Sequence, residues 1–354
     1  MTSTESGGPL VFSRLVDRQA RVGDITDQCR STWDKIGEAL ELRQADDALA
    51  LAEFAVEQEC RFVYDILTGW STEIRALLGR RGVSEDELDR VDERLRRLLA
   101  YPDGKPYSPE AGWHLLREAK QSLRSRIEAG AWEEAEAIVP TVCEAWRVLH
   151  DRVVDSSFGW MSAFVERFGE TAVPEMYEEI GGDHFAEFFA LADPERRAWD
   201  DEGRAAVLLD TVEAMRVHLS TVRRDGASIE LIEHEDRWEM TFDPCGSGGR
   251  ALRGDIVEGT PSRLESPYEF AYIKGAYDWT DGKSGMCVYC NHCQLLYEQW
   301  PMDRAGIPFL VVDPPTYPEG VGHDDPQRCR YTIYKSADAV PDEVYARCGK
   351  KRPG

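Results

Sequence analysis

The sequence predicts an α+β protein in which a multi-helix N-terminal region is followed by a small, loop-rich antiparallel β domain with a Cys-rich metal site. Three observations support this fold class. From residue 24 to about residue 224, apolar residues recur every three or four positions, the pattern of helices that pack one face on a core. Beyond residue 224, short segments alternate apolar and polar residues, as half-buried strands do. Between Cys287 and Cys293 the chain carries three thiols and an imidazole.

The chain is divided accordingly into three parts. We expect a flexible N-terminus over residues 1–23, an acidic α-helical domain over residues 24–224 and a Cys-rich metal-binding β domain over residues 225–354. A length of 354 residues favours two cores over one, and 42% hydrophobic residues supply enough material to fill both.

Local signals mark several helix boundaries in the N-terminal region. Ser84, with a glutamate three residues later, forms a capping box, and Ser108 stands before a proline suited to a first helical turn. A long amphipathic segment spans residues 132–168, and Pro140 is expected to kink it or to begin it anew. Further helices are expected over residues 174–180, 184–191 and 202–222.

Short apolar segments in the C-terminal third predict the strands. Residues 229–232 and 238–242 are separated by a polar stretch that fits a hairpin turn. Apolar runs over residues 309–312 and 331–334 follow many prolines and glycines and predict two further strands.

The charge of the chain excludes some partners. With 66 acidic against 42 basic residues, the formal net charge is −24. We expect no nucleic-acid partner, because phosphate binding needs clustered lysines and arginines, and no membrane partner, because no run of about 18 apolar residues occurs. The polar N-terminus has no features of an export signal, so we expect a cytoplasmic protein with reduced thiols.

The cysteine cluster predicts a metal. Cys-x2-Cys spacing lets two sulfurs reach one ion across a tight turn, and a distant fourth sulfur would close a tetrahedral site. Zinc is the expected ion and an iron–sulfur cluster the alternative, although the cluster lacks the fourth cysteine of the ferredoxin pattern. A closed site of four thiolates favours a mainly structural zinc. The expected ligands are Cys245, Cys287, Cys290 and Cys293, with Cys329 and His292 as alternatives.

A glycine-rich loop surrounds the expected fourth ligand. Residues 243–249 read Asp-Pro-Cys-Gly-Ser-Gly-Gly, which resembles the S-adenosylmethionine-binding motif of amino-group DNA methyltransferases. The glycines lie one residue closer to Asp-Pro than in that motif, and residues 238–242 alternate where the family has a buried parallel strand. We therefore interpret the loop as a tight turn that presents Cys245 to the metal.

Acid–base chemistry is expected from His150, Asp151, Asp155 and His184. Asp151 and Asp155 are four residues apart and share a helix face, and two histidines stand in or near the same helical stretch. We favour an enzyme of hydrolase or lyase type that acts on a small metabolite in a pocket at the helical–β junction. The alternatives are a non-enzymatic, zinc-stapled interaction or regulatory protein and an iron–sulfur redox protein. The sequence does not indicate an oligomeric state.

Overall fold

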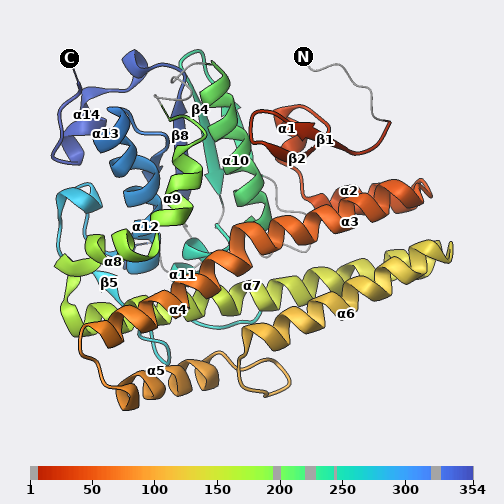
Figure 1. Ribbon diagram of the computed structural model, residues 1–354, viewed down its shortest axis with the longest axis horizontal. Coiled ribbons are helices and arrows are strands. Elements are labelled where there is room, and N and C mark those ends of the chain that lie inside the picture. The colour runs from red at the N-terminus through yellow and green to blue at the C-terminus, as the bar shows by residue number, and fades with distance from the viewer. Residues whose placement is uncertain (1–6, 194–200, 220–228, 243–244, 320–327, 354) are drawn as a thin grey trace.

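The protein is an α+β molecule in which helices outweigh strands (Figure 1). The computed structural model describes residues 7–193, 201–219, 229–242, 245–319 and 328–353. Among these residues, the expected helical region and the expected antiparallel sheet are both present. The expected division into domains at residue 224 stays a prediction.

Long helices build the N-terminal region. One continuous helical stretch runs from Ala45 to Arg80 and contains a π-helical turn, η1 (Cys60–Tyr64), at its middle. In chain order the helices are α1 (Ile25–Gln28), α2 (Thr32–Glu41), α3 (Ala45–Glu59), α4 (Asp65–Arg80), α5 (Glu85–Leu98), α6 (Pro109–Glu128), α7 (Trp132–Phe168), α8 (Val173–Ile180), α9 (Gly182–Phe189) and α10 (Asp201–Leu219), with a 3-10 turn, η2 (Glu170–Ala172), before α8.

The expected helix starts are confirmed, and one expectation about Pro140 is corrected. Ser84 forms a capping box at the start of α5, and the Ser108 hydroxyl accepts the N–H of Ala111 in α6. Pro140 does not begin a new helix, because α7 continues through it. The side chain is exposed, so water can satisfy the carbonyl that has lost its helical partner.

A four-stranded antiparallel sheet forms the centre of the C-terminal part, in the order β3-β4-β8-β7. The expected hairpin pairs β3 (Glu230–Glu233) with β4 (Arg237–Phe242). The other expected strands are β8 (Cys329–Tyr334), which pairs with β4, and β7 (Val311–Asp313), which pairs with β8. Met240, Phe242, Tyr331 and Ile333 are buried, as the alternating pattern requires.

Short helices fill the remainder of the C-terminal part, which is more helical than the sequence pattern suggested. A second two-stranded sheet pairs β5 (Tyr272–Ile273) with β6 (Met286–Cys287). The helical elements are α11 (Gly248–Arg253), η3 (Asp278–Thr280), η4 (Val288–Cys290), α12 (Asn291–Gln294), η5 (Leu295–Gln299), α13 (Trp300–Ala305), η6 (Ala337–Ala339) and α14 (Asp342–Arg347).

Within the expected flexible N-terminus of residues 1–23, whose flexibility stays a prediction, two short strands occur. β1 (Leu10–Ser13) and β2 (Arg18–Arg21) pair as an antiparallel hairpin. Arg18 reaches α10, where its guanidinium lies 2.8 Å from Asp210 and 2.5 Å from Glu213. This contact bridges more than 190 residues of chain, so the local sequence carried no sign of it.

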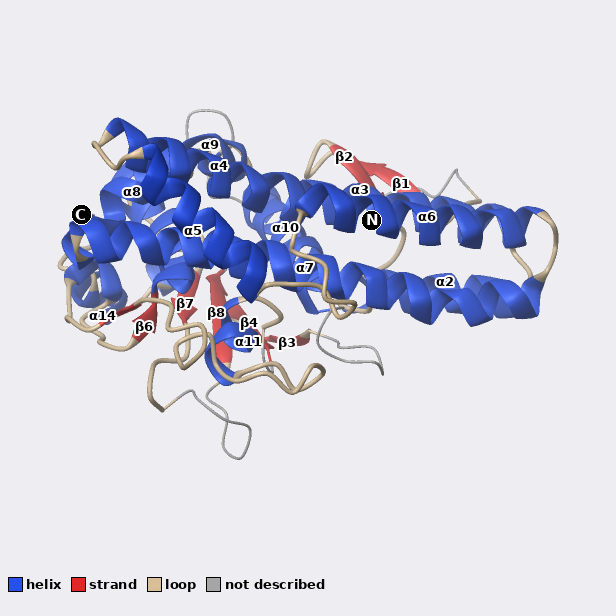
Figure 2. Ribbon diagram, turned by 90° about the horizontal axis from the view of Figure 1, so that it is seen from below, coloured by secondary structure: helices blue, strands red, loops and turns tan. Residues whose placement is uncertain are grey.

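Two hydrophobic cores hold the molecule together. The larger core combines helices α2 to α8 with residues 251–296, and the smaller one packs α9 and α10 against the four-stranded sheet and α14. Figure 2 shows that α2, α3, α6 and the first part of α7 project beyond the sheet as long arms. No helix of the described chain is long and apolar enough to cross a bilayer.

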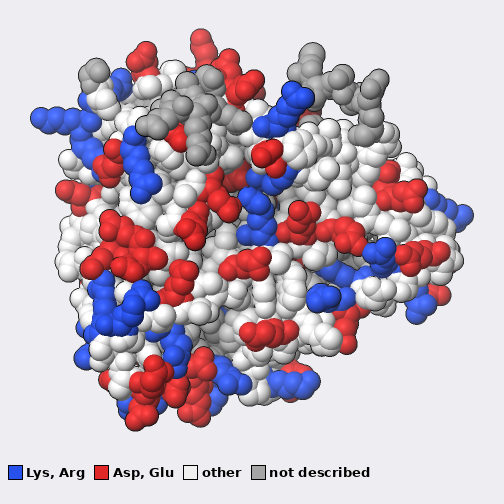
Figure 3. Space-filling view, in the orientation of Figure 1, with Lys and Arg blue, Asp and Glu red and all other residues white. Residues whose placement is uncertain are grey.

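Acidic and basic side chains are interspersed in small groups over the face shown in Figure 3. The expectation that the protein binds no nucleic acid and resides in the cytoplasm stays a prediction.

Candidate functional site

A cavity that opens to solvent lies where the helices meet the four-stranded sheet. Helices η1, α4, α9 and α10 form one side of the cavity. The loop before α11, the segment from η4 to η5 and strands β7 and β8 form the other side. Its lining is mostly apolar, but four thiols and three imidazoles also reach it: Cys245, Cys290, Cys293, Cys329, His184, His218 and His292.

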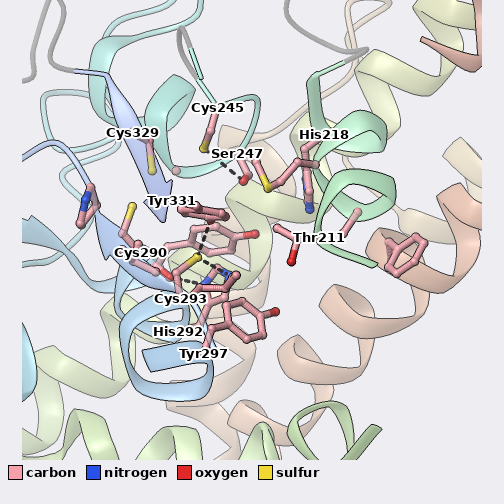
Figure 4. A pocket seen from close by; sticks show the side chains of 18 of the residues that line it. Thr211, His218, Cys245, Ser247, Cys290, His292, Cys293, Tyr297, Cys329 and Tyr331 are labelled. Carbon is pink, nitrogen blue, oxygen red and sulfur yellow. Dashed lines mark hydrogen bonds between the residues drawn. The ribbon is translucent and has the colours of Figure 1, made fainter. Parts of the chain in front are cut away.

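Helix α10 presents one face to the cavity. Thr211, Met215 and His218 line it at spacings of four and three residues, which places them on one side of a helix. Figure 4 shows Thr211 and His218 across the cavity from the labelled cysteines. The cavity therefore has an imidazole-bearing wall and a thiol-bearing wall.

The thiol-bearing wall contains most of the expected metal ligands. Cys290, Cys293 and Cys245 line the cavity, and Cys287 lies behind them with its sulfur 2.8 Å from that of Cys290. The alternative ligands Cys329 and His292 line the same cavity. Among the described residues, no three of these sulfur and imidazole atoms lie within 4.8 Å of one another, so a fully formed tetrahedral set is not present.

Backbone groups at this wall fit a thiolate site. The Gly249 N–H lies 3.2 Å from Cys245 Sγ, and the Cys290 N–H lies 3.3 Å from Cys287 Sγ. A Cβ on Gly248 would collide with Cys290 Sγ and lie 3.9 Å from Cys287 Sγ. The glycine therefore leaves the space that the sulfurs occupy, and the N–H groups would stabilise negative charge on them. The expected role of the loop in presenting Cys245 to a metal stays a prediction, and Asp243 and Pro244 lie outside the described residues.

Cys293 and His292 form a pair at the cavity wall. The Tyr289 carbonyl lies 2.5 Å from His292 Nδ1, which must therefore carry the hydrogen, because a carbonyl only accepts. His292 Nε2 then has a lone pair that faces Cys293 Sγ at 3.2 Å. Burial raises the pKa of Cys293 to about 12 and lowers that of His292 to about 4, so both groups are neutral in the protein alone. A metal ion would be needed to deprotonate this thiol at neutral pH.

Two π-helical turns border the cavity. Phe62 comes from η1 and Tyr297 from η5. The Tyr297 hydroxyl lies 2.7 Å from Nε2 of His184, whose pKa burial lowers to about 4. Such turns widen a helix locally and occur often at functional sites, since they redirect a side chain without breaking the helix.

His218 on the opposite wall begins a hydrogen-bonded chain into the interior. His218 Nδ1 lies 2.8 Å from His150 Nε2, and His150 Nδ1 lies 2.9 Å from an oxygen of Asp151. His150 and Asp151 are completely buried. Burial lowers the pKa of both imidazoles well below their usual range.

Beyond Asp151 lies a buried network of ion pairs between α7 and α11. Arg250 lies 3.2 Å from Asp151 and 2.6 Å from Asp155, and Arg263 lies 2.7 Å from Asp155. Burial disfavours the charge on Asp155, but Arg250 and Arg263 outweigh it and lower the pKa of this carboxyl. Asp155 is thus a structural ion-pair partner in this network.

Comparison with family models, curated proteins and solved structures found no match to the chain.

The structure separates the four expected acid–base residues into two places. His184 lines the cavity, whereas His150, Asp151 and Asp155 lie behind its wall. Their catalytic role stays a prediction. Sequence reasoning missed His218, although it falls on the same face of α10 as Thr211 and stands three residues after Met215. It also missed Tyr331, whose hydroxyl lies 3.2 Å from Cys293 Sγ.

A second group of acidic and thiol side chains lies beneath the cavity wall. Ligand atoms of Asp281, Glu298 and Cys348 lie within 4.8 Å of one another, and all three residues are buried. The Arg347 guanidinium already occupies this group, 2.6 Å from Glu298 and 3.4 Å from Asp281. The Gln294 amide donates to the Asp281 carboxylate as well. This group is an ion-pair cluster that anchors the segment bearing Cys293 and Tyr297.

Proposed function

We propose that the protein is an enzyme that converts a small molecule in the junction cavity, with zinc bound to the thiols of its wall. The observation that carries the proposal is the convergence of four thiols and three imidazoles on one mostly apolar cavity. Ligand sites of enzymes combine an apolar lining with a few converging polar groups in this way.

The chemistry of the donor set favours a soft or borderline ion. Thiolate sulfur and imidazole nitrogen are the ligands that zinc binds in proteins. Cys287 and Cys290 supply the pair at closest approach, with Cys293, Cys245 or the alternatives Cys329 and His292 to complete the set. His292 donates its other ring N–H to a backbone carbonyl, as metal-binding histidines usually do.

The location of the thiols favours a catalytic over a purely structural metal. A structural zinc is closed off by four protein ligands, whereas a catalytic zinc keeps one position open. Here the sulfurs of Cys245, Cys290 and Cys293 stand on a wall that is open to ligand, not inside a sealed core. When bound, zinc would supply Lewis acidity at that wall.

Metal analysis tests the binding part of the proposal. Protein purified without oxygen should contain about one zinc per chain. Cys290→Ser should lose most of it, whereas Cys143→Ser, which changes a thiol on α7 outside the cavity, should keep it. A brown protein with visible absorption would instead identify an iron–sulfur cluster. Metal-free wild-type protein would overturn the assignment of zinc.

Cobalt substitution tests whether the metal has an open position. Co²⁺ in place of zinc gives absorption bands that depend on coordination, so we expect them to change when a small thiol such as 2-mercaptoethanol is added. Ala214→Trp, which fills the cavity from α10, should abolish that change and leave the cobalt bound. Bands that do not respond in the wild type would show a closed, structural site and contradict an enzyme of this kind.

A further inference from the structure

His218 connects the cavity to a completely buried carboxyl through His150. His218 lines the cavity on α10, His150 and Asp151 follow behind it on α7, and the two hydrogen bonds between them measure 2.8 and 2.9 Å. Figure 4 shows His218 opposite Tyr331 and Cys293, so a ligand in the cavity would lie between the imidazole and the thiol-bearing wall.

The hydrogen bonds couple the tautomers of the two rings. If Asp151 is ionised, its oxygen accepts from His150 Nδ1, so His150 Nε2 has the lone pair and accepts from His218 Nδ1. His218 Nε2 is then an acceptor. If Asp151 is protonated, every bond reverses, and His218 Nε2 becomes a donor. Both rings carry the same tautomer in either state, because they share one hydrogen bond.

We propose that His218 Nε2 exchanges a proton with the cavity ligand, and that His150 and Asp151 are the positioning residues that relay this proton to a buried carboxyl. The ligand's O–H or N–H proton moves to His218 Nε2, the Nδ1 proton of His218 moves to His150 Nε2, and the Nδ1 proton of His150 moves to Asp151. The ligand is left as an anion and Asp151 is neutral, so atoms and charges balance. The ligand class is a small molecule with an acidic hydroxyl or N–H group.

The surroundings of Asp151 suit it to hold that proton. The charged groups that face it are Arg147 on α7 at 3.0 Å and Arg250 on α11 at 3.2 Å, with the carboxylates of Asp155 and Asp255 nearby. Burial raises the pKa of Asp151 to about 8, and Arg250 opposes the shift. His150 and His218 stay neutral, so protons shift along the hydrogen bonds from His218 to Asp151 without leaving a charge on either ring.

The proposal rests on the proposed function only in that the cavity takes a ligand, and its test needs neither ligand nor metal. Nitrogen-15 labelling of histidine distinguishes protonated from unprotonated ring nitrogens by NMR. Coupling across the N–H···N hydrogen bond identifies the His150–His218 pair in the wild type without a substitution. We expect the two rings to show the same tautomer at every pH, and both to reverse together as Asp151 titrates.

Asp151→Asn should hold the rings of His150 and His218 in one tautomeric state. The amide does not titrate, so both rings should keep one shared tautomer at all pH values: Nδ1–H where the amide oxygen faces His150 Nδ1, and Nε2–H where the amide nitrogen does. Asp155→Asn is the matched control, because it also removes a carboxylate that pairs with Arg250 but has no hydrogen bond to His150. Both rings should still reverse together, but at a lower pH, because the Asp155 charge helps to raise the pKa of Asp151. Opposite tautomers in the wild type, or rings that titrate independently, would overturn the relay even if zinc and ligand bind as proposed.

Discussion

Gly248 is a residue of the thiol-bearing wall that leaves no room for a side chain. An added Cβ would collide with Cys290 Sγ. The Cys290 side chain has a single rotatable bond to its sulfur, so it can relieve the collision only by turning the sulfur away.

We therefore expect Gly248→Ala to weaken zinc binding about 10- to 100-fold, the range for changes that misorient a ligand. Competition with a chromogenic chelator would measure the affinity. Gly37→Ala in α2 is the control, since nothing lies within 4 Å of its added Cβ and it should leave zinc affinity unchanged. Unaltered affinity in the Gly248 variant would remove Cys290 from the ligand set.

His184 should make the stability of the fold depend on pH. Its pKa is about 4 in the folded protein because burial disfavours the charged ring, whereas an unfolded histidine titrates near 6.5. Below about pH 6.5 the unfolded chain binds more protons, so stability decreases as the pH falls toward the folded pKa.

Lowering the pH from about 7 to 5 should therefore cost about 2 kcal/mol of unfolding free energy through His184 alone. Urea unfolding at the two pH values would show a loss smaller by that amount in His184→Gln. The same change at His114, which is exposed on α6, should leave the loss as in the wild type. An equal loss in the His184 variant would mean that the ring is protonated in the folded protein.

At the scale of elements, the segment from α12 to η5 lines the cavity with one face and contacts the ion-pair cluster with the other. His292, Cys293 and Tyr297 face the cavity, while Gln294 and Glu298 face the ion-pair cluster with Arg347. Burial raises the pKa of Glu298 to about 8, and the neighbouring Asp281 adds to the shift, while Arg347 opposes it.

Removal of Arg347 should destabilise the protein by about 3–5 kcal/mol, because two buried carboxyls lose their cation. The loss in Arg347→Met should be larger at about pH 9 than at about pH 7, because Glu298 is protonated in both folded proteins at pH 7, whereas above its pKa of about 8 only the wild type can stabilise the ionised carboxylate with Arg347. Chemical denaturation at both pH values would measure it. Adding Glu298→Gln to the variant should restore part of the stability; failure to do so would show that the cluster is held by other contacts.

The elements that the sequence predicted correctly are those whose signals are local. A capping box needs only Ser84 and its neighbours, and the β3–β4 hairpin needs only its own alternation. The π-helical turns η1 and η5 have no such local signal in the sequence. The β1–β2 hairpin was missed for the same reason, since Arg18 finds its partners on α10.

At the scale of the whole molecule, the larger core is built from both the helices and the C-terminal part. Trp146, Phe158 and Tyr177 from the helices belong to the same buried cluster as Phe270 and Tyr289 from the C-terminal part. The sequence could place thiols and histidines on their elements but could not show that α10 brings His218 opposite the thiols, because that depends on how the two parts pack.

A chain of residues 1–224 alone should therefore lack a cooperative fold. Without residues 251–296, the buried face of α7 would be exposed to water. This large apolar surface would bind a hydrophobic dye. Calorimetry of this chain should show no sharp transition, in contrast to the full chain. A cooperative transition with no dye binding would establish the helical region as an independent domain.

The cavity draws its walls from residues between Phe62 and Tyr331, so it is complete only when stretches far apart in the chain have met. Occupancy of the cavity and folding of the molecule are therefore linked equilibria. A ligand present at about 100 times its dissociation constant would add about 2.7 kcal/mol to the stability of the entire fold, and not only to its site. Conversely, a substitution that loosens the Arg18 contact to α10 would weaken ligand binding although Arg18 does not touch the ligand. An increase in the melting temperature would in turn report which compounds bind in the cavity.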